Sequence, residues 1–354
     1  MKKVIHIFIV GTGKVGTQFL KLISEKSELK TENGDFIFKI AGIANHSRML
    51  INHKGINPAD WKLNLLKTGE PAIIKSFISR MQKTDLTNSI FLDCTDGDEI
   101  VKYYDVILRS IPIVTPNKSA NSGTYQKYLA LKKTVKRFKT DFRYSANVGV
   151  GLPSLDVINS LLSGGDRITS IEGLFSSTMN YLLDKLLITN KKFSELLKEA
   201  HDKGLTEPDP RNDLNGIDTA RKILILAREA GYKIEMSDIE IENLVPPILR
   251  NINLLDKFYN SIKIADSKFD SLKKLAVKTK RKLVYSARLR NNKVSVGIEM
   301  VDSGHPFYSA SSNEKVVLFY SEFYNENPLI IKGQSGGAKA TASVLVSDIL
   351  KTVG

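Results

Sequence analysis

Residues 4–16 read VIHIFIVGTGKVG, and this stretch decides the fold. The apolar, largely β-branched run Val4–Val10 has the composition of a buried strand, and the glycine-rich segment Gly11–Gly16 follows it directly. Phe19, Leu20 and Ile23 then recur at helical spacing. A strand, a glycine turn and a helix in this order are the context in which G-x-G-x-x-G predicts a dinucleotide-binding domain.

The three glycines of this turn have different predicted tasks. Gly11 allows the tight turn, Gly13 lets backbone N–H groups approach a pyrophosphate, and Gly16 lets helix and strand pack closely. The positive end of the helix dipole favours the same anion. A purely structural glycine turn is the alternative. We expect the cofactor to contact Gly11, Thr12, Gly13, Lys14, Val15 and Gly16.

A second strand is predicted over residues 38–44 and leads into Asn45, His46, Ser47 and Arg48. In NAD-binding domains an acidic residue near the end of this strand usually holds the ribose hydroxyl. Here no acid is present, and Arg48 is placed to meet a 2′-phosphate. We therefore expect NADP(H) to be favoured over NAD(H), with Asn45, Ser47 and Arg48 at the cofactor. The alternative is an exposed loop arginine, and His46 is expected at the surface.

Two later strands are predicted to end in polar turns, over residues 89–97 and 111–118. Ligands of open α/β sheets lie beyond the carboxyl ends of the strands. Thr95 and Lys118 are therefore expected to point toward the cofactor. Cys94 has no neighbouring histidine in the sequence, so we interpret it as a packing residue and not as a nucleophile.

The composition indicates a globular protein of two domains. The chain has 354 residues and is 42% hydrophobic, which is enough for two cores. Its single cysteine excludes a disulfide framework and suits the reducing cytoplasm. The apolar start is short, lacks a cleavage site and runs straight into the glycine turn, so it predicts a strand and no signal peptide. No apolar segment reaches 18 residues, so no membrane span is expected.

The formal net charge of +14 raises the question of a nucleic-acid partner. Basic residues cluster most at 132–143 and 268–293, without a zinc pattern or a repeated aromatic-glycine RNA signature. We therefore favour a solvated, lysine-rich surface and expect no nucleic acid as partner. Attraction of anionic ligands and weak nucleic-acid contact are the alternatives.

Residues 207–222 read EPDPRNDLNGIDTARK and place four carboxylates before an apolar helical run. Two prolines hold Glu207 in an extended loop. Asp218 and Lys222 are four residues apart in the emerging helix, so they lie on one face within pairing distance. Such an acid would hold the ammonium group in place. A surface ion pair is the usual alternative, and the charge density before a buried helix argues against it.

These motifs resemble the homoserine dehydrogenase family, most closely the dehydrogenase half of bifunctional aspartokinase–homoserine dehydrogenases. The resemblance covers nearly the whole chain. It rests above all on GLTEPDPRNDLNGIDTARKILILAREAG at 204–231, followed by DIEIENLVP at 238–246. It also rests on GTGKVG, IAGIANHSRML, DCT, TPNK with the following SAN, NVGVGLP and STMNYLL.

The resemblance implies interconversion of L-homoserine and L-aspartate 4-semialdehyde with NADP(H) or NAD(H), in threonine, methionine and isoleucine biosynthesis. Glu207 and Asp213 match the positions that bind the substrate's α-amino group, and Asp218 matches an acid that orients Lys222. One or both of Lys222 and Lys118 would protonate the alkoxide. The resemblance also implies Gly333 at the cofactor, a homodimer, and a monovalent-cation site at the main-chain carbonyls of Val148, Val150 and Leu152.

The sequence departs from the family pattern at four positions. Leu205 replaces a tyrosine, Ser145 replaces an acid beside the expected cation site, and Ser177 replaces a glycine. Ser335 removes one glycine from the motif that begins at Gly333. These changes keep open a catalytically impaired, cofactor-binding paralogue, and the net charge keeps open a nucleic-acid binder.

The expected fold class is α/β, with a Rossmann-type nucleotide-binding domain and an α+β substrate and dimerisation domain. We expect the first domain over residues 1–145, with the helix 337–354 returning to it, and the second over 146–336. No kinase half or regulatory module is expected within these residues, so feedback by threonine is not predicted. A stand-alone protein and a fragment of a longer polypeptide both stay open.

Overall fold

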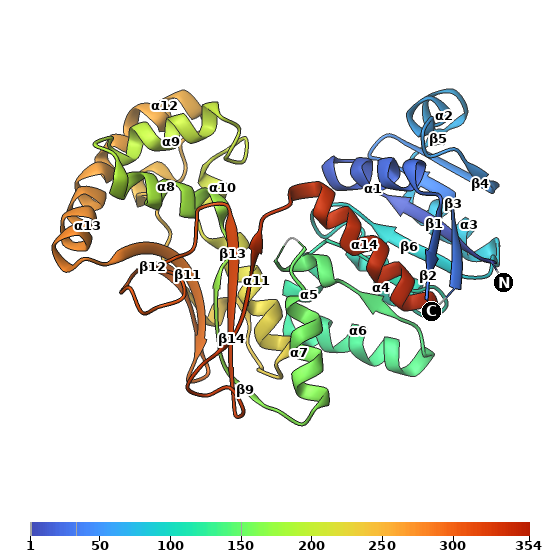
Figure 1. The fold of residues 1–354 in the computed structure, drawn as a ribbon. Helices are drawn as coiled ribbons and strands as arrows, with labels where there is room; N and C mark the ends of the chain where they lie inside the picture. Colours follow the sequence, from blue (N-terminus) through green and yellow to red (C-terminus); the bar gives the residue numbers. More distant parts are fainter. Residues whose placement is uncertain (1, 33, 150) are drawn as a thin grey trace. The chain divides into compact units, whose positions relative to one another are not determined.

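The computed structural model describes residues 2–32, 34–149 and 151–354, and the chain divides into two compact units (Figure 1). Unit 1 comprises Met1–Gly151 and Gly336–Gly354, and unit 2 comprises Leu152–Ser335. Unit 1 contains a largely parallel sheet with helices, and unit 2 contains a second, largely antiparallel sheet with helices. The predicted α/β fold class is confirmed.

Unit 1 begins with the predicted strand, glycine turn and helix. Its elements are, in chain order, β1 (Lys2–Val10), α1 (Lys14–Glu25), β2 (Glu28–Thr31), β3 (Gly34–Ala44), β4 (Arg48–Ile56), α2 (Trp61–Thr68), β5 (Glu70–Pro71), α3 (Ile74–Lys83), β6 (Ser89–Asp93), α4 (Tyr104–Ile107), β7 (Ile113–Val114), α5 (Ser119–Ser122), α6 (Tyr125–Phe138), β8 (Phe142–Arg143) and α14 (Gly337–Val353).

The sheet of unit 1 has the order β5-β4-β3-β1-β6-β7-β8, with β2 paired to β3. Strands β3, β1, β6, β7 and β8 run parallel to one another. From β1 the chain goes to β3 on one side and later to β6 on the other, so the switch point lies between β1 and β6. Ligands of open α/β sheets bind at the carboxyl ends of strands beside such a point. Val10 and Asp93 are register partners there, which places the glycine turn beside the end of β6.

The core of unit 1 explains why β1 is apolar along most of its length. Ile5, Ile7 and Ile9 face a cluster that includes Phe19 of α1 and Leu345 of α14. Helix α14 packs directly against α1, although hundreds of residues separate them in the sequence (Figure 1). A central parallel strand is covered on both faces, so every side chain of β1 from Ile5 to Val10 is buried.

On the other face of the sheet, Phe8 of β1 meets Phe77 of α3 edge to face, with ring centroids 6.3 Å apart. Gly42 of β3 lies beside this pair, and a Cβ there would stand 2.6 Å from the Phe8 ring. The strand IAGIA therefore needs its glycine to make room for two aromatic rings.

Unit 2 contains its own helices and the strands of its own sheet. Its elements are, in chain order, α7 (Ser154–Ser163), β9 (Ile168–Leu174), α8 (Ser177–Ile188), α9 (Phe193–Asp202), α10 (Arg211–Leu214), α11 (Ile217–Glu229), β10 (Ile239–Ile241), α12 (Leu255–Ser261), α13 (Asp266–Thr279), β11 (Lys282–Arg290), β12 (Lys293–Val301), β13 (Glu314–Ser321) and β14 (Leu329–Gln334).

The sheet of unit 2 has the order β10-β12-β11-β9-β13-β14 and is antiparallel except for the β10–β12 pair. Helix α11 lies along β9, β11 and β12, and α8 follows β9 and contacts β11. Strand β9 and helices α8 and α9 follow one another in the chain.

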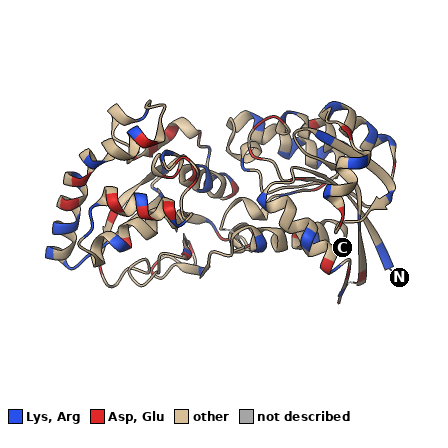
Figure 2. Ribbon diagram, turned by 90° about the horizontal axis from the view of Figure 1, so that it is seen from above, with Lys and Arg blue, Asp and Glu red and all other residues tan. Residues whose placement is uncertain are grey.

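Charged residues are interspersed in both units, as Figure 2 shows. Blue lysine and arginine segments alternate with red aspartate and glutamate segments, and many are paired, such as Lys192 with Asp270 and Lys268 with Glu242. Among the described residues, no helix combines the length and apolar character needed to cross a bilayer.

Gly216, the N-cap residue of α11, allows a test of how closely the start of this helix packs against its neighbours. Its φ of +75° is left-handed, and a Cβ there would lie 2.2 Å from Tyr285 Oη and 2.9 Å from Ile241. Gly216→Ala should destabilise the protein by about 2 to 4 kcal/mol, because backbone strain and overpacking add. Thermal and urea unfolding measure the change.

Gly204 provides the control for this substitution, because it has a similar φ of +67° with nothing within 4 Å of its Cβ position. Gly204→Ala should cost only the backbone term, about 1 to 2 kcal/mol. Equal effects of the two substitutions would show that the contact with Tyr285 is unimportant.

Candidate active site

The glycine turn of unit 1 has the geometry that its sequence predicts. Gly11 has a φ of +94°, and a Cβ there would stand 2.6 Å from the backbone of Cys94. A Cβ on Gly16 would lie 2.0 Å from the carbonyl oxygen of Gly11. Gly13 is different, because nothing lies within 4 Å of its Cβ position. Packing within the chain therefore requires Gly11 and Gly16 but leaves open space at Gly13.

The start of α1 suits an anionic group. Its N-cap residue, Gly13, supplies no side-chain hydrogen bond, and the first turn carries no acidic residue. Thr12 contributes its carbonyl to the Thr17 hydroxyl at 2.8 Å, and Lys14 and Val15 form the first residues of the helix. Backbone N–H groups at a helix start are satisfied by side chains, water or ligands. The open space at Gly13 and these amides fit the pyrophosphate of a dinucleotide.

A buried carboxylate organises the carboxyl end of β6. Asp93 is fully buried and accepts hydrogen bonds from the Thr95 amide at 2.8 Å, the Thr95 hydroxyl at 2.6 Å and the Tyr104 hydroxyl at 2.5 Å. Asn117 donates to Asp93 at 3.2 Å and to the Gly97 carbonyl at 2.9 Å. Burial raises the pKa of Asp93 above its ordinary value, against the opposing effect of these donors. The network fixes Thr95.

The same network places Lys118, which follows Asn117 and precedes the short helix α5. The Lys118 carbonyl accepts from the Asn121 and Ser122 amides at 3.1 and 2.9 Å. Asn147 donates to the carbonyls of Thr115 and Asn117 at 3.2 and 3.3 Å, which ties the end of β7 to residues 145–147. The backbone of Lys118 is therefore fixed, and its side chain is half-buried.

The β3–β4 turn contains the residues expected at the ribose. The Asn45 side chain accepts from the Ser47 amide at 2.9 Å, the Ser47 hydroxyl at 3.1 Å and the Arg48 amide at 2.7 Å. This is an Asx turn that closes on itself. Arg48 begins β4 and donates from Nη1 to the Gly69 carbonyl at 2.8 Å. Residues 45–48 place no carboxylate at the end of β3, and His46 is exposed as expected.

In unit 2, two lysines donate hydrogen bonds to one turn. The carbonyl oxygen of Phe175, between β9 and α8, accepts from Lys222 Nζ at 3.0 Å and from Lys315 Nζ at 2.8 Å. Lys222 also pairs with Asp218 at 2.6 Å, which confirms the predicted i,i+4 pair. Lys222 is almost buried in α11, while the Asp218 side chain is half-exposed. The pair therefore differs from an ordinary surface ion pair.

Of the acids in the 207–222 stretch, Asp213 contacts the same turn directly. Asp213 receives the Glu207 amide at 2.8 Å and lies 2.9 Å from the hydroxyl of Thr178, the second residue of α8. Burial raises the pKa of Asp213, and the nearby charges of Glu207 and Asp218 act in the same direction. Unit 2 therefore brings Glu207, Asp213, Asp218 and Lys222 around residues 175–178.

No pattern in the sequence indicated a role for Lys315. It lies in the apolar strand β13, is only 3% exposed, and also donates to the Ser177 hydroxyl at 2.7 Å. A lone lysine in a strand is usually solvated, and its contact with Ser177 joins residues far apart in the sequence. The available signal was the serine that replaces glycine at position 177, which provides the hydroxyl partner.

The remaining expected site residues lie apart from these contacts. Gly333 is in β14 opposite Lys315, and a Cβ there would stand 2.7 Å from the Leu152 side chain. Of the carbonyls expected to hold a cation, Val148 belongs to unit 1, Leu152 belongs to unit 2 and accepts from the Ser154 amide at 2.9 Å, and Val150 lies outside the described residues. The cation site stays a prediction.

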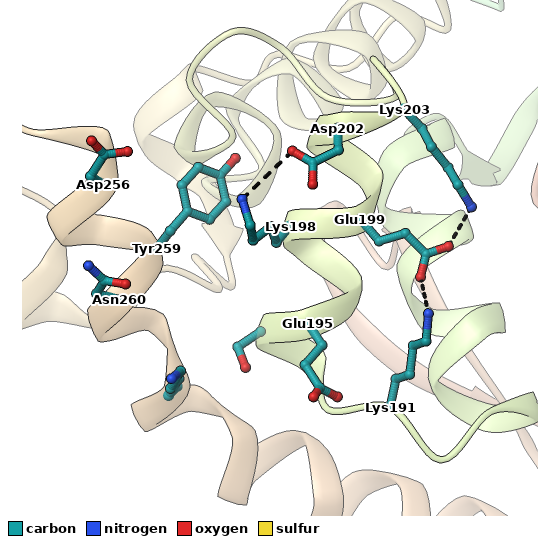
Figure 3. Close-up of a pocket in the computed structure, with 11 residues that line it drawn as sticks. Lys191, Glu195, Lys198, Glu199, Asp202, Lys203, Asp256, Tyr259 and Asn260 are labelled. Carbon is teal, nitrogen blue, oxygen red and sulfur yellow. Dashed lines mark hydrogen bonds and ion pairs between the residues drawn. The ribbon is translucent and has the colours of Figure 1, made fainter.

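A hollow of about 980 Å³ on unit 2 contains none of the expected site residues (Figure 3). It lies between α9 and α12, and several of its charges are paired with one another. Glu199 accepts from Lys191 and Lys203, which lower its pKa to about 2, and Lys198 lies 3.8 Å from Asp202. Charges that neutralise one another in this way do not form a preorganised ligand site.

Two family models together match most of the chain. One, described as Homoserine dehydrogenase, matches residues 153–350, and one described as Homoserine dehydrogenase, NAD binding domain, matches residues 11–144. Among curated proteins, a chloroplastic bifunctional aspartokinase/homoserine dehydrogenase 2 of Zea mays is 35% identical over 99% of this chain and 38% of its own length. The homoserine dehydrogenase of Schizosaccharomyces pombe is 32% identical over 98% of this chain and 95% of its own. The chain spans about two fifths of the bifunctional relatives.

Solved structures share the fold. A Candida auris protein of unknown function has a TM-score of 0.90 and 29% identity, covering 99% of this chain and 98% of its own. A hyperthermophilic archaeal homoserine dehydrogenase in complex with NADPH has a TM-score of 0.75 and 21% identity, covering 100% and 98%.

The Asp93 network generates a prediction about stability. Tyr104→Phe should lower the midpoint of thermal unfolding at pH 7, because the buried carboxyl loses a hydroxyl donor, at a cost of about 1 to 3 kcal/mol. Tyr103→Phe is the control, since Tyr103 is only half-buried and the donors to the Asp93 carboxylate are Thr95, Tyr104 and Asn117. Equal midpoints for the two variants would contradict the role of Tyr104.

Proposed function

The chain belongs to the homoserine dehydrogenase family, and we propose that it interconverts L-homoserine and L-aspartate 4-semialdehyde with a nicotinamide dinucleotide. The observation that carries this proposal is the arrangement of Glu207, Asp213, Asp218 and Lys222 around the turn at 175–178. The step would serve threonine, methionine and isoleucine biosynthesis, as the resemblance implies, and the single cysteine suits the reducing cytoplasm. A homodimer and a monovalent cation at the carbonyls of Val148, Val150 and Leu152 belong to the same proposal.

Two acids would bind the α-amino group of the substrate. Asp213 is held in place by the Glu207 amide and faces the Thr178 hydroxyl, so its carboxylate is preorganised. Glu207 is exposed and adds a second negative charge. An ammonium group is attracted by two carboxylates at short range, and its binding would keep Asp213 ionised despite burial.

Lys222 would protonate the oxygen that becomes an alkoxide during reduction. Its ammonium is anchored by Asp218 and by the Phe175 carbonyl, so its position does not depend on the substrate. A preorganised cation stabilises developing negative charge and can transfer its proton there. Lys118 would supply a second positive charge from the cofactor-binding unit.

The cofactor, when bound, supplies or accepts the hydride. The residues that would hold it are the turn Gly11–Gly16, the β3–β4 turn with Asn45, Ser47 and Arg48, Thr95, Lys118 and Gly333. NADP(H) would be favoured over NAD(H), because Arg48 is present and no acid follows β3. The NADPH named for the archaeal structure supports this choice.

A direct assay tests the proposal. The assay measures homoserine-dependent reduction of NADP+ and NAD+, and semialdehyde-dependent oxidation of NADPH and NADH. We expect measurable activity in both directions. Bound cofactor without turnover would favour the impaired paralogue instead. Retention on DNA that persists at about 0.15 M salt and with saturating NADPH would favour the nucleic-acid binder.

Lys222→Ala should lower kcat by roughly 100-fold or more, because the proton donor is lost. The Kd for NADPH, measured by fluorescence titration, should stay within about twofold of the wild type, since Lys222 has no predicted cofactor contact. Lys198→Ala is a matched control, because Lys198 also pairs with an aspartate four residues away but on an exposed helix face. Near-normal turnover of Lys222→Ala would remove its assigned role.

Arg48→Ala should shift the ratio of kcat/KM values from NADP(H) toward NAD(H), because the charge that meets the 2′-phosphate is lost. Arg48→Gln separates this effect from the local structure, since its amide can still donate to the Gly69 carbonyl. Both variants should shift the ratio. A shift in Arg48→Ala alone would assign the effect to the Gly69 contact, and an unchanged ratio in both would reject the role of Arg48.

A further inference from the structure

Lys315 is a buried amine beside the proposed proton donor. Its Nζ lies 2.8 Å from the Phe175 carbonyl and 2.7 Å from the Ser177 hydroxyl, and Lys222 Nζ lies 3.0 Å from the same carbonyl. The two nitrogens are therefore at most about 6 Å apart, the sum of their distances to the shared oxygen, which is the range over which like charges act strongly.

We propose that Lys315 is a positioning residue that acts through Lys222, holding the donor ammonium between Phe175 and Asp218 and promoting release of its proton. This inference rests on the proposed function. A carbonyl oxygen has two lone pairs, and the two lysines occupy the same acceptor. The Ser177 hydroxyl gives Lys315 a second contact that Lys222 does not share. Lys315 is thereby fixed beside the carbonyl that Lys222 also contacts.

Few helices and strands contribute charged groups near Lys315. Helix α11 contributes Lys222 and Asp218, and the β9–α8 turn contributes only neutral oxygens together with the positive end of α8. The neighbouring strand β14 places Gly333 opposite Lys315. Glu314, the preceding residue, pairs with Lys332 at 3.1 Å.

These surroundings make the charge of Lys315 sensitive to pH. Burial, followed by the positive charge of Lys222, lowers the pKa of Lys315 from 10.5 to about 7, against the opposing charge of Asp218. Below neutral pH the charged amine repels the Lys222 ammonium and favours transfer of its proton to the alkoxide. Above neutral pH this repulsion is lost while the hydrogen-bonded geometry can persist.

The experiment compares the wild type with Lys315→Met and Lys315→Arg. Methionine is an uncharged side chain of similar length, and arginine keeps the charge at every pH used. For semialdehyde reduction from pH 6 to 9, the wild-type kcat should show an ionisation near pH 7. Lys315→Met should lack it and stay about tenfold lower than the wild type at pH 6, and Lys315→Arg should lack it and stay near the low-pH plateau. The KM for the semialdehyde should change less than twofold.

A double-mutant cycle separates positioning from an independent effect on the fold. If Lys315 acts through Lys222, Lys315→Met should cause no further loss of kcat in the Lys222→Ala background. An equal, multiplicative loss in both backgrounds would overturn the proposal. A wild-type profile without the ionisation, or a Lys315→Met profile that retains it, would also overturn it.

Stability against pH supplies a readout that needs no activity. Between about pH 7 and 10 the amine is neutral in the folded chain and protonated in the unfolded chain, so the unfolded state binds more protons. The free energy of unfolding of the wild type, relative to that of Lys315→Met, should therefore rise with pH in this range. The rise corresponds to a change of up to about tenfold per pH unit in the folding equilibrium constant, and it should be lost as the pH falls toward 7.

The two arms distinguish the possible failures. A wild type without homoserine-dependent activity would overturn the proposed function and the positioning role together, whatever the stability curve shows. An active wild type whose kcat profile is unchanged in Lys315→Met would overturn the positioning role alone. The same result with the expected stability curve would identify Lys315 as a buried structural amine.

Discussion

The proposed chemistry of unit 2 depends on the turn between β9 and α8. Within residues 175–178, one carbonyl accepts from two lysines, one hydroxyl receives Lys315, and another faces Asp213. Ser176 caps the helix by accepting from the Met179 amide at 3.2 Å, which fixes the backbone of the turn. Lys222, Lys315 and Asp213 all form hydrogen bonds with these four residues. A displacement of the turn would therefore move all three side chains together.

Unit 1 achieves preorganisation by different means. There the absence of a side chain at Gly11 and Gly16 allows a close approach of strand and helix, and the buried Asp93 fixes Thr95 through two hydrogen bonds. Neither the glycine turn nor the Asp93 network requires a bound ligand to hold its geometry. The glycine turn creates open space at Gly13, and the carboxylate network keeps the adjacent strand ends rigid. A site of this kind loses little conformational entropy on binding.

The features that the sequence predicted are those encoded within one element or across one turn. The glycine turn follows from the strand and helix beside it, and the Asp218–Lys222 pair follows from helical spacing. Lys315 could not be found in this way, because Phe175 is 140 residues away and only the pairing of β13 with β9 brings them together. The bond of Arg48 to Gly69 likewise depends on a long-range contact. The sequence showed that Ser177 is unusual, but only the structure shows which group its hydroxyl meets.

The position of α14 has a consequence for biosynthesis of the protein. Its Leu345 and Ile349 are fully buried in the cluster that contains β1 and α1, yet the ribosome makes this helix only after all of unit 2. The apolar surface of α1 that α14 covers is therefore exposed to solvent until the intervening residues have been synthesised. The native core of unit 1 is therefore complete only when translation has passed α14.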